Sequence, residues 1–155
     1  MTEKTWRLPA EQFLDILTFM QTYRQEVKVR ARGSSMWPFI KDNDVVVLSP
    51  CDPGLLRTGD TVAYKTRGTG VAVHRIVSSR SGGILLKGDA GCSPDGWMDR
   101  STVIGRIIAV YRGRRRVRWG LGPERSLIAI ISRRYSWAKL LAVPRRMYAF
   151  ARKAF

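Results

Sequence analysis

Three consecutive segments decide the expected fold: Thr61-Val-Ala-Tyr-Lys65, Arg67-Gly-Thr-Gly70 and Val71-Ala-Val-His-Arg-Ile-Val77. The first and third have the composition of β-strands, and the glycine-rich segment between them is a hairpin signal. Further short apolar segments, separated by glycine, proline or Asp-Asn turns, are found at 27–31, 45–48, 84–86, 103–111 and 114–119. Because no helical pattern separates these strands, the sequence predicts a mainly β fold, either a small antiparallel β-barrel or a folded sheet.

Helical periodicity is confined to the two ends of the chain. Residues 8–24 follow an apolar stripe of helical spacing, and a second stripe begins after Pro123. The second stripe consists of Leu127, Ile128, Ile131, Tyr135 and Ala138, and Pro144 should break or kink its helix. We therefore expect an N-terminal amphipathic helix in 1–25, one domain in 26–119 and a basic amphipathic helical tail in 120–155.

The charge of the chain is strongly positive and unevenly placed. The formal net charge is +16, and residues 111–155 hold 13 Lys and Arg against one acidic residue, Glu124. Such a segment is either a solvated tail or a contact for an anionic surface, and we favour a phospholipid membrane over nucleic acid. On this view the chain remains soluble when truncated after Trp119. No uncharged run approaches the roughly 20 residues of a membrane span, and residues 1–7 lack the apolar stretch of a signal peptide. We expect a peripheral membrane protein on the cytoplasmic side.

The sequence offers no metal or cofactor site. Cys51 and Cys92 have no metal-ligand spacing and are too few for a disulfide framework, and His74 is the single histidine. We expect ordinary thiols and a protein without a cofactor.

A serine, a histidine and two aspartates form a possible catalytic set. Ser35 lies in the glycine- and proline-bounded segment 33–40, His74 on an expected strand, and Asp89 and Asp95 in the loop that follows residue 86. A lone strand histidine is usually structural, and Gly-Asp is an ordinary turn pair. Together, however, they supply the nucleophile, base and orienting carboxylate of a Ser-His-Asp hydrolase.

The ordered motifs of the chain resemble those of the S24/S26 serine peptidase superfamily. The resemblance covers roughly residues 29–112. Its motifs are Gly33-Ser-Ser-Met-Trp-Pro38 with Asp44, Thr58-Gly-Asp-Thr-Val62, Val73-His-Arg-Ile-Val77, Lys87-Gly-Asp89 and Val103-Ile-Gly-Arg106. The most similar branch is the type I signal peptidases of the endoplasmic-reticulum and archaeal kind, which use histidine where most bacterial signal peptidases and the LexA-like self-cleaving repressors use lysine.

The resemblance implies a role for each candidate residue. Ser35 would be the nucleophile, with its backbone N–H as an oxyanion donor, and His74 the general base. We favour Asp95 as the residue that orients His74 and Asp89 as a structural or supporting residue, although the reverse assignment stays open. Lys65 would be a solvated strand residue. Gly33 stands where some bacterial relatives have a helping serine hydroxyl, which leaves the second oxyanion donor open.

The resemblance also implies a serine endopeptidase that cleaves a signal, leader or precursor peptide. Two departures from the family are the absence of a transmembrane anchor before the serine and the long basic segment after Trp119. A second hypothesis is a LexA-like self-cleaving, nucleic-acid-associated regulator, which the lack of an upstream helix-turn-helix pattern disfavours. A third is an inactive basic membrane-binding module of the same fold.

Overall fold

The computed structural model describes residues 15, 18–20, 22–67 and 70–142. Its strands are β1 (Val27–Arg30), β2 (Val45–Ser49), β3 (Thr61–Lys65), β4 (Val71–Arg80), β5 (Gly83–Lys87), β6 (Gly96–Met98), β7 (Val103–Arg112) and β8 (Arg115–Arg116). The structure also contains two short 3₁₀ helices, Pro53–Leu55 and Arg100–Thr102, and the α-helix α2 (Arg125–Arg134).

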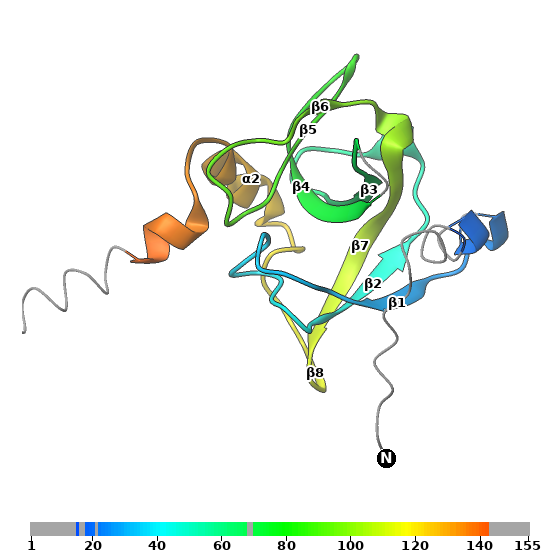
Figure 1. The fold of residues 1–155 in the computed structure, drawn as a ribbon, viewed down its shortest axis with the longest axis horizontal. Coiled ribbons are helices and arrows are strands. Elements are labelled where there is room, and N and C mark those ends of the chain that lie inside the picture. Colours follow the sequence, from blue (N-terminus) through cyan, green and yellow to red (C-terminus); the bar gives the residue numbers. More distant parts are fainter. Residues whose placement is uncertain (1–14, 16–17, 21, 68–69, 143–155) are drawn as a thin grey trace, which may run out of the picture.

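The strands form one antiparallel sheet in the order β1-β2-β7-β3-β4-β5-β6, with β8 attached to β7. Register shifts interrupt the β2–β7, β3–β7 and β4–β5 pairings. Such irregularities bend a strand and increase its twist, so the sheet is curled, as Figure 1 shows. Among the described residues, the two end strands of this order, β1 and β6, do not pair with each other. The prediction of a mainly β fold is confirmed, in the form of a folded sheet and not a closed barrel.

Two clusters of buried apolar side chains hold the folded sheet together. One cluster, around Leu48 and Val110, also takes in Met20 from the N-terminal segment and Met36 and Ile40 from the segment that carries Ser35. The other lies between β3, β4, β5 and the start of β7, with Val62, Ile76 and Leu86 fully buried. The serine segment is thus fixed to the sheet by its own apolar residues.

Two strands differ from the sequence prediction. The strand β6 was expected to be part of a loop; it has only three residues, too few for a visible alternation, and it forms by pairing with β5. The strand predicted at 114–119 is reduced to Arg115–Arg116 plus a hydrogen bond from Val117 N to Val110 O of 2.8 Å. All other predicted strands are present within one to three residues of their expected ends.

The C-terminal helix is shorter than the apolar stripe from Leu127 to Ala138 predicts. It ends at Arg134, Tyr135 is extended (φ −126°, ψ 158°), and helical structure resumes at 137–142. The prediction of one continuous face was therefore wrong: Ile128 is buried, whereas Leu127 and Tyr135 are exposed. The predicted break at Pro144 and most of the predicted helix in 8–24 lie outside the described residues, and 18–20 and 22–23 are helical.

The segment from Gly120 to Trp137 packs on the folded sheet and its loops and is not a detached tail. The inner face of α2 buries Ile128, Ala129 and Ser132 and contacts β4. In Figure 1, α2 lies beside β4 and β5, while the described N-terminal residues lie at the opposite end of the molecule. No helix in the described part of the chain is long and apolar enough to cross a membrane.

Candidate active site

Ser35 lies on a tight turn that the sequence makes rigid. Gly33 has φ +88°, a conformation that favours glycine, and its N–H donates to Asp42 Oδ1 at 2.9 Å. Trp37 N donates to Ser34 O at 3.1 Å and Ile40 N to Met36 O at 3.0 Å. Because Met36 is buried in the core and Ser35 is exposed, the turn presents the serine hydroxyl at the surface.

The histidine meets the serine at Gly88. A Cβ placed on Gly88 would lie 3.1 Å from His74 Nε2, 3.2 Å from Ser35 Cβ and 2.7 Å from Ser35 O. The serine side chain and Nε2 therefore border the same point, and only glycine leaves that point free. Ala90 N also donates to Ser35 O at 2.8 Å, which joins this loop to the serine turn. Within the described residues, the hydroxyl and amide N–H of Ser35 have no hydrogen-bond partner.

The other ring nitrogen of the histidine is held by Asp95. His74 Nδ1 lies 2.5 Å from Asp95 Oδ2, with 14% and 29% of the two side chains exposed. Asp95 is placed there by the N–H that it donates to Leu86 O at 2.9 Å, at the start of β6. With Nδ1 bound to the carboxylate as an N–H donor, Nε2 is the nitrogen that faces Ser35, as in a Ser-His-Asp arrangement.

Tyr64 completes this group. Its hydroxyl lies 3.1 Å from Asp95 Oδ2 and 3.2 Å from His74 Nδ1, and its side chain is buried. Burial, and then the charge of and the hydrogen bond to Asp95, raise the pKa of Tyr64, so the phenol stays protonated and donates to the carboxylate.

Asp89 lies away from the histidine ring. Its carboxylate accepts from Arg75 Nε at 2.9 Å and Arg75 Nη2 at 2.8 Å, and from Ser132 Oγ at 2.8 Å. Both Asp89 and Arg75 are fully buried. The structure thus brings Ser35, His74 and Asp95 together and directs Asp89 into the interior.

Neither lysine near the site takes the position of a base. Lys65 is exposed at the end of β3, opposite Val71, whereas His74 is opposite Val62. Lys87 is buried; its Nζ donates to the carbonyls of Ser132 and Tyr135 at the end of α2, and burial lowers the pKa of its amino group. Within the described residues there is no cluster of residues that could hold a metal ion.

Sequence reasoning missed Tyr64 and Gly88. The register of β3 and β4 places Tyr64 on the same face as Val62, diagonal to His74, and such diagonal neighbours are within reach of aromatic side chains. The length of the turn at 66–70 leaves that register undetermined from the sequence. The glycine of the pair Lys87-Gly88 is visible in the sequence, but the sequence does not reveal that Ser35 and His74 approach it.

Comparison of the chain with protein-family models, with curated proteins and with solved structures finds no match. Fold and site together define a mainly β protein that exposes a serine beside a carboxylate-bound histidine.

Proposed function

We propose that the protein is a serine endopeptidase in which Ser35 is the nucleophile, His74 the general base and Asp95 the residue that orients the histidine. The observation that carries the proposal is the 2.5 Å contact of His74 Nδ1 with Asp95 Oδ2, combined with the position of Nε2 beside Ser35. A structural histidine would satisfy both ring nitrogens in the interior, whereas Nε2 faces an exposed serine.

The arrangement supports acyl transfer through a covalent intermediate. His74 Nε2 takes the proton of Ser35 Oγ as the oxygen attacks the scissile carbonyl carbon, and Asp95 stabilises the imidazolium that forms. The backbone N–H of Ser35 is available to the oxyanion, because no acceptor in the described residues uses it. His74 then gives the proton to the leaving amine. In the second half of the reaction, water attacks the acyl group with His74 again as the base, which releases the product and restores Ser35.

Tyr64 acts as a positioning residue in this mechanism. Asp95 Oδ2 accepts from both Tyr64 and His74, so the phenol helps to hold the carboxylate oxygen that binds the imidazole. Since the tyrosine is buried and its pKa is raised, it remains a donor while the histidine changes charge.

An extended peptide is the substrate that fits the sheet. Residues 71–74 of β4 pair with β3 on one side, and the pairing of β4 with β5 begins only at Arg75. In the part of the chain that the structure describes, no strand pairs with the other side of this segment. That side can hydrogen-bond a substrate strand, as in other cases of β-strand addition, and would lead its scissile bond past His74. A signal, leader or precursor peptide supplies such an unstructured segment.

Labelling by a fluorophosphonate probe, followed by a scan of candidate peptides, tests the proposal. We expect labelling of the wild type, none of Ser35→Ala, and normal labelling of the neighbouring control Ser34→Ala. His74→Ala and Asp95→Asn should lose peptide cleavage by orders of magnitude, and Ser35→Ala/His74→Ala should be little worse than either single variant. Loss of activity in Lys65→Ala with full activity in His74→Ala would overturn the assignment.

A further inference from the structure

The outward face of α2 exposes aliphatic side chains next to arginines. Leu127 and Ile130, three residues apart and therefore on one face, are 60% and 63% exposed. Arg133 and Arg134 are also exposed, one turn further along the helix. A solvated helix face normally carries polar residues alone, so the two large aliphatic groups call for an apolar partner.

A cavity lies between α2 and the sheet. It has a volume of about 430 Å³ and is lined by Arg133 and Arg134, by the hydroxyl-bearing Thr58, Ser78 and Ser79, and by Ile130 and Val77. No carboxylate is among its described lining residues. Two guanidinium groups and several hydroxyls can donate hydrogen bonds to the oxygen atoms of a phosphate group. Ile130 lines the same cavity.

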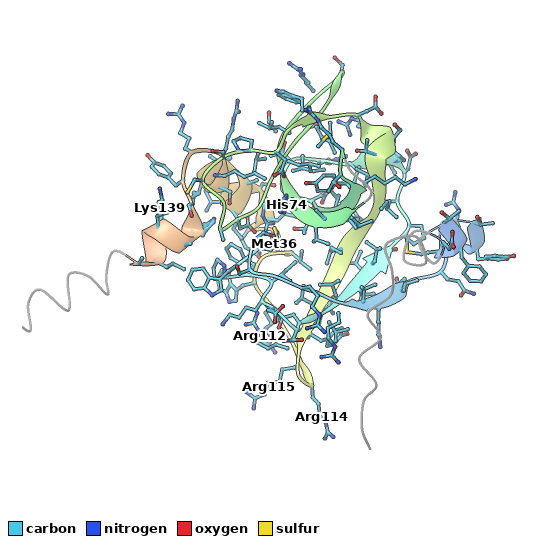
Figure 2. All side chains as sticks on the ribbon, viewed as in Figure 1. Met36, His74, Arg112, Arg114, Arg115 and Lys139 are labelled. Atoms are coloured by element: carbon cyan, nitrogen blue, oxygen red, sulfur yellow. The ribbon has the colours of Figure 1, made fainter. Side chains whose placement is uncertain are left out.

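The same combination continues beyond the break at Tyr135. Tyr135, Leu140 and Leu141 are 57%, 39% and 43% exposed, and Lys139 is exposed between them. Figure 2 shows Lys139 at the α2 end of the molecule, far from Arg112, Arg114 and Arg115. Around α2, exposed cations therefore stand next to exposed aliphatic side chains.

We propose that the outward face of α2 docks on an anionic phospholipid bilayer. Leu127 and Ile130 enter the interface between headgroups and acyl chains, and Arg133 and Arg134 bind a lipid phosphate at the mouth of the cavity. Aliphatic insertion beside cations is what an interfacial helix requires, whereas nucleic acid would match the charges and leave the aliphatic groups without a partner.

Docking on this face would also orient the candidate active site. On the inner side of the same segment, Ser132 Oγ donates to Asp89 and Ser136 Oγ to Ala90 O at 2.7 Å, and Ala90 N binds Ser35 O. The serine is thus joined to the docking helix through one loop. The proposal does not depend on peptidase activity, and Ser35→Ala should bind vesicles like the wild type.

The test is cosedimentation of the full chain with vesicles of phosphatidylcholine alone and of phosphatidylcholine mixed with phosphatidylglycerol. We expect binding to the mixed vesicles that weakens with salt, because charges at the surface are screened over about 10 Å at 0.1 M. Arg133→Glu/Arg134→Glu should lower partitioning at least about tenfold, since each cation at an anionic surface is worth about fivefold. Leu127→Ser/Ile130→Ser should weaken binding without any change of charge.

The control is Arg114→Glu/Arg115→Glu, which makes the same change of charge at the exposed β7–β8 turn. This variant should retain most of the binding. Equal losses in the two charge-reversal variants would show attraction by net charge alone and overturn the proposal. Salt-sensitive binding to duplex DNA that is tighter than binding to the mixed vesicles, and unaffected by Leu127→Ser/Ile130→Ser, would overturn it in favour of nucleic acid.

Discussion

Arg75 and Asp89 form an ion pair 2.8 Å long in which neither side chain is exposed to solvent. Arg75 follows His74 in β4, and its Nη1 also donates to the carbonyls of Gly59 and Gly120 at 3.0 and 2.8 Å. Asp89 accepts in addition from Ser132. Every charged group in this interior cluster is therefore compensated, which is the condition for burying an ion pair at all. Because Arg75 follows His74 and Asp89 follows Gly88, the cluster fixes the backbone beside both of these site residues.

Asp89→Asn should destabilise the fold by about 3–5 kcal/mol, because it leaves Arg75 as an uncompensated buried charge. Chemical denaturation measures the change in the free energy of unfolding. The exposed control Glu26→Gln should stay within about 0.5 kcal/mol of the wild type. Asp95→Asn, at a partly exposed position, should cost far less stability than Asp89→Asn and far more activity. An Asp89→Asn variant of native stability that no longer reacts with the probe would give the orienting role to Asp89.

The sequence predicted the strands because glycine and proline turns separate short apolar segments, and these local signals survive in the fold. It predicted Ser35 and His74 from motif and residue type. The separate positions of Asp89 and Asp95 depend on tertiary contacts: Asp89 meets Arg75 and Ser132, which are 14 and 43 residues away in the chain. The prediction of one continuous C-terminal helix was wrong for the same reason. The helix ends where Lys87 binds the carbonyls of Ser132 and Tyr135, and the spacing of apolar residues does not reveal this tertiary contact.

Tyr64→Phe should shift the acid limb of the pH–rate profile to higher pH. Without the phenol, the Asp95 carboxylate shares its charge with His74 alone, so the protonated imidazole is stabilised and the base is lost to protonation at a higher pH. The shift should be up to about one pH unit, since a hydrogen bond contributes about 1 kcal/mol and one unit corresponds to about 1.4 kcal/mol.

The rate of probe labelling across pH 5 to 9 measures this shift. Tyr111→Phe, at a partly exposed position near the end of strand β7, is the matched control and should leave the profile unchanged. A Tyr64→Phe variant that is merely less stable, with the acid limb in its original place, would mean that the tyrosine only fills space.

Asp44 should contribute to stability above pH 5 and lose that contribution in acid. Burial alone would raise the pKa of its carboxyl, but hydrogen bonds from Arg112 and from the Lys41 N–H, with the charges of both residues, outweigh it and hold the pKa below its usual value. Arg112 donates to both carboxylate oxygens, at 3.0 and 2.8 Å. Since the pKa is lower in the folded state than in the unfolded one, the contribution is complete above the unfolded pKa of about 3.9 and disappears as the pH falls through the folded pKa.

Comparison of wild type with Asp44→Asn across the acid range measures that contribution. At pH 7 the variant should be about 1–3 kcal/mol less stable, and the difference should shrink steadily as the pH falls below about 4. A difference that stays constant down to pH 2 would mean that the charge of Asp44 plays no part.

Truncation after Trp119 should unfold the protein, contrary to what charge and periodicity alone suggest. The cut removes the Gly120 carbonyl from Arg75, Ser132 from Asp89, and both carbonyl acceptors from Lys87. It would also uncover the sheet surface that buries Ile128 and Ala129. Two buried cations that lose partners, at several kcal/mol in all, are a large part of the 5–15 kcal/mol that stabilises a typical domain. A chain that ends at Ala142 keeps every one of these contacts and should show the cooperative thermal unfolding of the full chain by circular dichroism. A soluble, cooperatively folded 1–119 fragment would instead mean that the sheet closes its own core and that the C-terminal segment is dispensable.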